Sequence, residues 1–358
     1  MAVGEASALG RGRSVDQPRW APLPQGPLPW PDRLEHVGAP TGIGFTGHHT
    51  NGDQGHPGSI TNATLGLWET HRHSGPHAAA TLLTHESGKP FQLVRKLSGG
   101  ETGAHEFLGG DGRSVIVKWD SRPESRKLRG EAVVLSERLR TVAGWPVPTQ
   151  SVVDADEALF VIQEFMPGAP PNNFDHLLVD RLLDLHSRRL GLARPEDPVH
   201  WPTALIETLT VGGEGYCLHS SFRDFDERTR SLVEKVEAFG STIDESDLIG
   251  NDIVHWDLHG GNLLLDDGSL TAVVDTDFSA VGDACFDLVA LALSSLSLPC
   301  ESGVRTRLFA SAFDDLDDLK AQVYLAHLFI RIIDWPIRRR ALDEVNFWLA
   351  RADELLKI

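Results

Sequence analysis

One stretch of the chain combines a carboxylate and a carboxamide within a glycine-containing loop. Asp257 and Asn262 lie five positions apart in residues 255–265, and apolar residues border this loop on both sides. Residues 271–274 then read as a short strand that ends at Asp275. Two adjacent loops of this kind can aim three oxygen-bearing side chains at one point. Such a set suits Mg²⁺, which prefers carboxylate, carbonyl, water and phosphate oxygens as ligands.

The order of these residues predicts phosphoryl transfer. In that chemistry one Asp orients the acceptor hydroxyl, an Asn holds one metal ion and a second Asp holds the other. Asp257, Asn262 and Asp275 occur in this order and at this spacing. We therefore expect Asp257 to be the catalytic residue, with Asn262 and Asp275 as the metal ligands.

The wider pattern resembles the aminoglycoside phosphotransferase family of small-molecule kinases, whose fold and metal chemistry are shared with protein kinases. The motif reads His255-x-Asp257-x4-Asn262, then Val274-Asp275, then Gly282-Asp283-x3-Asp287-Leu288. The resemblance implies an α+β, two-lobed kinase-like fold with a small β-rich lobe and a larger helical lobe. It also implies ATP and Mg²⁺ as cofactors and a hydroxyl of a small molecule as acceptor. The same resemblance makes His255 and Asp287 braces of the loop.

Strand-like segments upstream would form the small lobe. Residues 113–118 form a β-branched run that ends at Lys118, one of only seven lysines. This run resembles the kinase strand whose lysine contacts the α- and β-phosphates of ATP. An upstream loop contains Gly99, Gly100 and Gly103, and glycine lets backbone N–H groups approach phosphates closely. We expect all four residues to bind the nucleotide.

A helical segment follows the lysine strand. Apolar residues recur at helical spacing in 123–142, and Glu131 lies within it. The kinase ion pair needs an acid on this helix to hold Lys118. Glu131 fits the family pattern best; Glu124, Glu137 and an acid that is merely solvated remain the alternatives.

The segment 163–168 resembles the connector between the two lobes of the family. Its main chain near Glu164 and Met166 would contact the edge of adenine. We expect the small lobe to span 89–166 and the helical lobe to span 167–358, with helical apolar patterns over most of the second range.

Residues 1–88 differ in composition from the rest. They are rich in Gly, Pro and His and contain no lysine. Such a segment favours disorder, and removal of 1–85 is expected to leave the fold intact. An incorrect start codon is a second explanation, and a metal-binding tail is disfavoured because no Cys or carboxylate recurs at ligand spacing.

Composition limits the partners. A formal charge of −18 argues against nucleic acid and anionic membranes, which need clustered cations. Three scattered cysteines and the absence of a long apolar run favour a cytoplasmic protein. The oligomeric state stays open. A cationic acceptor is one interpretation of six acids ahead of the catalytic loop, and a solvated helix face is the other; these acids are Asp224, Asp226, Glu227, Asp244, Glu245 and Asp247.

The chain departs from the pattern in two respects: Trp256 in the catalytic loop, and residues 274–277, which lack the Asp-Phe-Gly of protein kinases. Trp256 stands where a small residue, often glycine, is common. His259 occupies the place of the lysine of protein Ser/Thr kinases, and no Ala-Pro-Glu segment follows, so a protein substrate is not expected. A nucleotide-binding pseudokinase without turnover is the alternative function. Four intact residues argue against it, namely Lys118, Asp257, Asn262 and Asp275.

Overall fold

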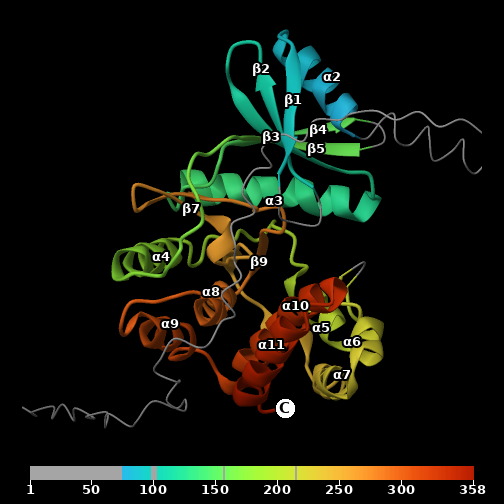
Figure 1. Cartoon of the computed structure of the whole chain (residues 1–358), viewed down its shortest axis with the longest axis vertical. Helices are drawn as coiled ribbons and strands as arrows, with labels where there is room; N and C mark the ends of the chain where they lie inside the picture. The colour runs from blue at the N-terminus through green and yellow to red at the C-terminus, as the bar shows by residue number, and fades with distance from the viewer. Residues whose placement is uncertain (1–74, 98–102, 156–157, 214–215) are drawn as a thin grey trace, which may run out of the picture. The chain divides into compact units, whose positions relative to one another are not determined.

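The computed structural model describes residues 75–97, 103–155, 158–213 and 216–358 (Figure 1). All of them belong to one compact unit, Gly42–Ile358. Among these described residues, every helix is too short or too polar to cross a membrane.

A five-stranded antiparallel sheet forms the first part of this unit. Its strand order is β1-β2-β3-β5-β4. The strands are β1 (Phe91–Lys96), β2 (His105–Gly109), β3 (Ser114–Asp120), β4 (Gln150–Ala155) and β5 (Ala158–Glu164). Side chains alternate between the faces of a strand. Val115 and Val117 therefore face one side of the sheet, and Lys118 faces the other.

Helix α3 (Pro123–Thr141) connects β3 to β4 and packs against β4, β5 and β9 (Figure 1). It begins at a proline, which suits the first helical position because that N–H has no intrahelical partner. Leu135 and Leu139 are buried on its inner face. The helix thus links the sheet to the loop region that carries Asp275.

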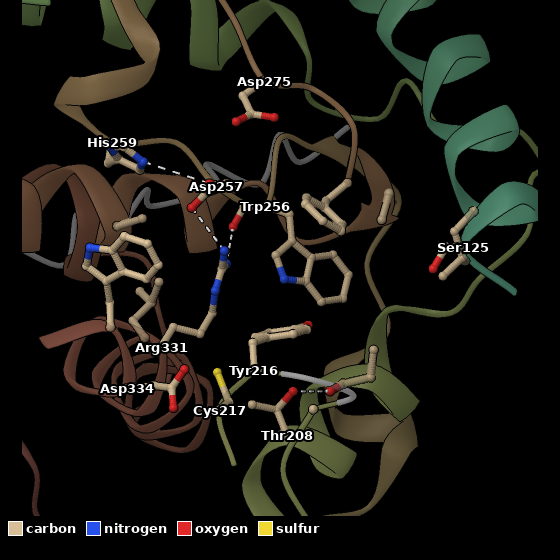
Figure 2. A pocket seen from close by; sticks show the side chains of 18 of the residues that line it. Ser125, Thr208, Tyr216, Cys217, Trp256, Asp257, His259, Asp275, Arg331 and Asp334 are labelled. Carbon is tan, nitrogen blue, oxygen red and sulfur yellow. Dashed lines mark hydrogen bonds and ion pairs between the residues drawn. The ribbon is translucent and has the colours of Figure 1, made fainter. Parts of the chain in front are cut away.

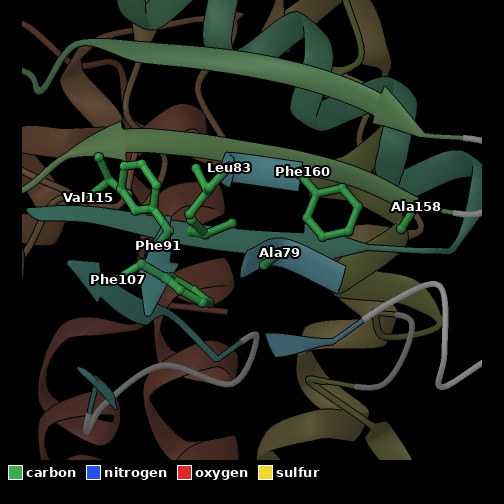
Figure 3. Close-up of a cluster of buried hydrophobic side chains, with 8 residues drawn as sticks. Ala79, Leu83, Phe91, Phe107, Val115, Ala158 and Phe160 are labelled. Atoms are coloured by element: carbon green, nitrogen blue, oxygen red, sulfur yellow. The ribbon is translucent and has the colours of Figure 1, made fainter. Parts of the chain in front are cut away.

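Helix α2 (Pro76–Ser87) corrects the expected domain boundary. It ends at Gly88, whose φ of 67° gives the left-handed cap that glycine favours. Ala79 and Leu83 are buried against the sheet in a cluster with Phe91 and Phe160 (Figure 3). The boundary at residue 88 is therefore wrong, because the sheet needs this helix to cover its apolar face. The rest of the expected extension, residues 1–74, lies outside the described residues.

Replacing Leu83 with Ala tests this packing. We expect the free energy of unfolding to fall by about 2–5 kcal/mol, the usual loss for a buried leucine. Leu177→Ala is the matched control, because Leu177 is 77% exposed and its loss should change stability by less than about 0.5 kcal/mol. Urea denaturation of both variants measures the difference. Equal stabilities would show that α2 contributes nothing to the folded domain.

The second part of the unit is mainly helical. It contains α4 (His176–Arg188), α5 (Trp201–Thr210), α6 (His219–Phe225), α7 (Glu227–Gly240), α8 (Cys285–Ser297), α9 (Val304–Phe313), α10 (Asp318–Arg339) and α11 (Leu342–Leu355). Two 3₁₀ turns, η1 (Glu245–Leu248) and η2 (Gly260–Asn262), lie among them. Trp201, Phe286 and Tyr324 pack edge to face in its core. The expected α+β architecture, with a small sheet-rich part and a larger helical part, is confirmed.

Two small antiparallel ladders interrupt the helices. Strand β6 (Asp252–Val254) pairs with β9 (Ala280–Gly282), and β7 (Leu263–Asp266) pairs with β8 (Ser269–Val273). The segments between these strands carry Asp257, Asn262 and Asp275.

Candidate active site

The β7–β8 hairpin brings two of the predicted residues together. Leu263 lies opposite Val273 in the ladder, and the Val274 N–H donates to the Asn262 carbonyl at 2.9 Å. Asn262 precedes one strand of the hairpin and Asp275 follows the other. Both side chains are therefore placed at the same end of the hairpin.

Asn262 also joins this hairpin to the catalytic loop. Its amide nitrogen donates to the Asp257 carbonyl at 2.8 Å, and the side chain is largely buried. This bond uses the side-chain nitrogen, so the amide oxygen is the atom of Asn262 that is available to a metal ion. Asn262 and Asp275 thus supply the hard oxygen donors that Mg²⁺ prefers, and the residues fit the expected metal.

Asp257 is held by a residue from a distant helix. Its Oδ1 accepts a hydrogen bond from Arg331 Nη2 at 3.0 Å, and Arg331 Nη1 donates to the Trp256 carbonyl at 2.7 Å (Figure 2). Burial raises the pKa of Asp257, but Arg331 and His259 more than offset this, so that the pKa lies below its ordinary value. Asp257 is a carboxylate at neutral pH.

His255 is fully buried behind this loop. Its Nε2 lies 2.9 Å from the Val274 carbonyl, and its Nδ1 accepts the Asp257 N–H at 3.3 Å. Burial lowers the pKa of His255, which favours the neutral ring with its proton on Nε2. These contacts join the two loops, as expected for a residue that braces the site.

Asp287 fixes the backbone at the start of the catalytic loop. Its carboxylate accepts the His255 N–H at 2.7 Å and the Trp256 N–H at 3.0 Å. Arg189 forms an ion pair with the same carboxylate and also donates to the Ala284 carbonyl at 3.0 Å. Neither side chain is exposed to solvent. The Asp287 carboxylate thus accepts hydrogen bonds from the loop backbone, as expected of a residue that braces the loop.

Trp256 has a φ of 73°. Non-glycine residues rarely adopt this left-handed conformation, which explains why a small residue often stands here. The indole ring packs edge to face on Trp201 at 4.7 Å between centroids. Aromatic packing and the bonds to Asp287 and Arg331 thus hold a strained residue beside Asp257.

Breaking the buried ion pair should destabilise the domain. We expect Asp287→Ala to lower the free energy of unfolding by about 3–5 kcal/mol, because Arg189 is left charged and buried. Asp184 has a side chain that is 43% exposed and contacts Arg188 at 2.7 Å, so Asp184→Ala should change stability by no more than about 1 kcal/mol. Thermal and urea unfolding would measure both. A loss of similar size in the two variants would contradict the role of Asp287.

Lys118 reaches across from β3 to the loop after β8. Its Nζ lies 2.7 Å from Asp275 and 3.2 Å from Asp277, and the side chain is buried. Burial lowers the pKa of Lys118, but the two carboxylates outweigh it, so the pKa is raised above its ordinary value. A charged lysine therefore lies beside the candidate metal residue.

The expected pairing of Lys118 with Glu131 is wrong. Glu131 instead lies 3.1 Å from His200 Nε2 and 3.9 Å from Lys127 Nζ. Arg129 of the same helix is buried and pairs with Asp277. Residues two apart on a helix point about 200° apart, so the face of α3 that meets the loop after β8 carries Arg129.

The structure describes only some of the other residues that are expected to bind the nucleotide. Gly99 and Gly100 lie outside the described residues. Gly103 has a φ of 67°, a conformation that glycine adopts without strain. Glu164 ends β5, and its N–H donates to the Thr149 carbonyl at 2.9 Å. Met166 follows in the connector to α4, and its main-chain contact with adenine stays a prediction.

Residues 93–321 match the family model described as the phosphotransferase enzyme family. This match spans more than half of the chain. The chain belongs to that family.

Solved structures agree with the family fold. One is a thermostable mutant of aminoglycoside phosphotransferase APH(4)-Ia in a ternary complex with ADP and hygromycin B. Its sequence is 14% identical to this chain, and the TM-score is 0.53. The match covers 78% of this chain and 97% of that chain. Choline kinase LicA from Streptococcus pneumoniae is 13% identical with a TM-score of 0.53 over 78% and 98%. No significant match is found among curated proteins. At these identities the structures show the kinase-like fold alone.

A cleft of about 1590 Å³ opens beside Asp257 and Asp275 of this phosphotransferase (Figure 2). Helices α3, α5 and α10 each contribute to its walls. Aromatic side chains line much of it, namely Trp119, Tyr216, Trp256, Phe278, Trp335 and Trp348. A space of this size beside the catalytic loop is large enough for a small-molecule ligand.

The six acids that suggested a cationic acceptor do not line this cleft. Two of them stabilise the starts of helices instead: Asp226 caps α7 and Asp244 caps η1. The described lining contains other acids, including Glu207 and Asp334, but also cations such as Arg331. The acidic-pocket expectation therefore named the wrong residues, and the charge around the catalytic loop is mixed.

Arg331 is the site residue that the sequence reasoning missed. It lies in the apolar run 325–333 of α10, where a charged residue is unusual unless it is paired. A single charged residue within an apolar run was therefore the signal in the sequence that Arg331 has a buried partner. Its partner could not be read from the sequence, because Asp257 is 74 positions away.

Proposed function

We propose that the chain is an ATP-dependent phosphotransferase that transfers the γ-phosphoryl group to a hydroxyl of a small molecule. The observation that carries this proposal is that Asp257 and Asp275 line one cleft, while Asn262 contacts Asp257 and Lys118 contacts Asp275. Family membership supports the phosphotransferase chemistry. The phosphoryl-transfer chemistry open to these side chains supports ATP as donor and an alcohol as acceptor, and both are part of the proposal.

Asp257 orients the acceptor. Transfer through a loose transition state depends on alignment and charge stabilisation more than on a strong base. One carboxylate oxygen is held by Arg331, and the other can accept the hydrogen of the attacking hydroxyl. The proton passes to Asp257 late in the transfer. The ionised state of Asp257 is what this role requires.

Lys118 and the metal residues hold the donor. The lysine is charged and buried, so it can contact phosphate oxygens with little competition from water. Asn262 and Asp275 would hold Mg²⁺, which when bound neutralises charge on the phosphates. Asp277 also contacts Lys118, so the lysine keeps one carboxylate partner when Asp275 binds another group.

The acceptor is left as a small hydroxyl compound. The structural relatives include a phosphotransferase in complex with hygromycin B and a choline kinase, so hygromycin B and choline are both candidates for this chain. The aromatic walls favour an acceptor with apolar or planar surface. The mixed charges give no reason to restrict the search to cations.

Metal-dependent ADP formation against a panel of hydroxyl compounds tests the proposal. The panel should include aminoglycosides, choline and sugars, and mass spectrometry should detect one added phosphoryl group on the acceptor. We expect at least one compound to raise ADP formation when Mg²⁺ is present and none to do so when it is chelated. Tight nucleotide binding with no ADP formation under any condition would instead favour a pseudokinase.

A further inference from the structure

Arg331 lies at the centre of the described cleft, and its guanidinium points at the catalytic loop (Figure 2). It makes two separate hydrogen bonds, to Asp257 Oδ1 at 3.0 Å and to the Trp256 carbonyl at 2.7 Å. The side chain is only 18% exposed. A planar guanidinium with two fixed acceptors has little freedom to rotate.

Helix α10 is itself fixed at this point. Ile330 and Ile333, the residues on either side of this turn, are fully buried. One turn earlier, the His327 ring packs on the Trp256 indole with 6.1 Å between centroids. The helix that carries Arg331 is therefore packed against the loop that Arg331 contacts, and the position of the guanidinium is set by the core.

The two carboxylate oxygens of Asp257 have unequal surroundings. Oδ1 accepts the short bond from Arg331. Oδ2 has longer contacts, with Asn262 Nδ2 at 3.4 Å and His259 Nε2 at 3.8 Å. A carboxylate held at one oxygen has its second oxygen fixed in direction. That second oxygen is the one left for an acceptor hydroxyl.

We infer that Arg331 is a positioning residue that acts through Asp257: it holds Oδ1 and the neighbouring Trp256 carbonyl so that Oδ2 faces the acceptor hydroxyl. The inference rests on the proposed function. In this role Arg331 does not contact the phosphoryl group. Arg331 also holds the strained Trp256 backbone in place, which keeps the carboxylate from swinging with the loop.

A double-mutant cycle separates this role from the alternatives. The reaction is the slow hydrolysis of Mg·ATP, in which water takes the place of the acceptor. The variants are Arg331→Met, Asp257→Asn and their combination. We expect Arg331→Met to lower kcat by roughly 10²-fold, the effect of a misplacement of about 1 Å, with KM for ATP little changed. In the Asp257→Asn background the same change should have almost no further effect.

Two further variants guard against trivial results. Arg331→Lys keeps the charge and the alkyl stem but lacks the planar guanidinium that makes two hydrogen bonds at once. This variant should fold and still lose most of the turnover. Arg307→Met removes an arginine of α9 that pairs with Asp180, and neither residue lines the cleft, so it should keep wild-type kcat. Melting temperatures of all variants show which ones are folded.

Each outcome has a distinct meaning. An equal fold-loss in both backgrounds would overturn the inference, because Arg331 would then act independently of Asp257. Wild-type turnover in Arg331→Lys would overturn it as well, because a single charge would suffice. A wild-type protein that hydrolyses no ATP, with or without any acceptor, would overturn the proposed function and this inference together.

Discussion

Asp257→Asn should lower turnover by roughly 10²–10⁴-fold, the usual range for loss of a positioned proton acceptor. Affinity for ATP should stay nearly unchanged, because Lys118 and Asp275 remain in place. Asparagine is a sharper choice than alanine here. It keeps an oxygen for Arg331, whereas alanine would leave a largely buried guanidinium unpaired beside the Trp256 carbonyl.

Steady-state kinetics and nucleotide titration on the same preparation measure this effect. Asp266→Asn is the matched control, because Asp266 is exposed and lies at the turn of the β7–β8 hairpin. It should keep wild-type kcat. Turnover of Asp257→Asn within threefold of wild type, or an equal loss in the control, would remove Asp257 from its catalytic role.

Asp275→Asn should nearly abolish turnover and weaken the binding of Mg·ATP. A metal that neutralises charge in the transition state contributes several kcal/mol, so a loss of roughly 10³-fold in kcat is expected when an anionic ligand becomes neutral. Asp275 has a φ of 64°, and asparagine tolerates this left-handed conformation better than alanine. The variant therefore changes the charge with little strain.

Titration calorimetry with and without Mg²⁺ isolates the metal contribution. In the wild type, Mg²⁺ should strengthen nucleotide binding, and chelation should remove that gain. In Asp275→Asn the two conditions should give similar affinities. The same Mg²⁺-dependent gain in both proteins would show that Asp275 is not a metal ligand.

Local spacing explains why the proximity of Asn262 and Asp275 could be predicted. Asn262 and Asp275 bracket a short hairpin, so their proximity follows from the turn between them. The contacts of Asp287 with the loop backbone were also predicted, from the family resemblance. The roles of these residues in catalysis remain predictions.

Interactions over longer distances could not be predicted in the same way. Helix α2 has a weak apolar pattern, and only its contact with the sheet makes it part of the domain. Glu131 was chosen from a motif, but the rotation of α3 decides which charged residue meets the loop, and that residue is Arg129. Arg331 reaches Asp257 only because α10 packs beside Trp256.

The most direct test of the central claim is to follow the γ-phosphoryl group itself. ATP labelled at the γ-phosphorus is incubated with Mg²⁺, the protein and an acceptor that raised ADP formation. We predict that the label moves onto a hydroxyl of that acceptor in the wild type and that Asp257→Asn, loaded with the same nucleotide, transfers almost none. Label that reaches the acceptor equally fast with Asp257→Asn, or that never leaves ATP in the wild type, would contradict the account.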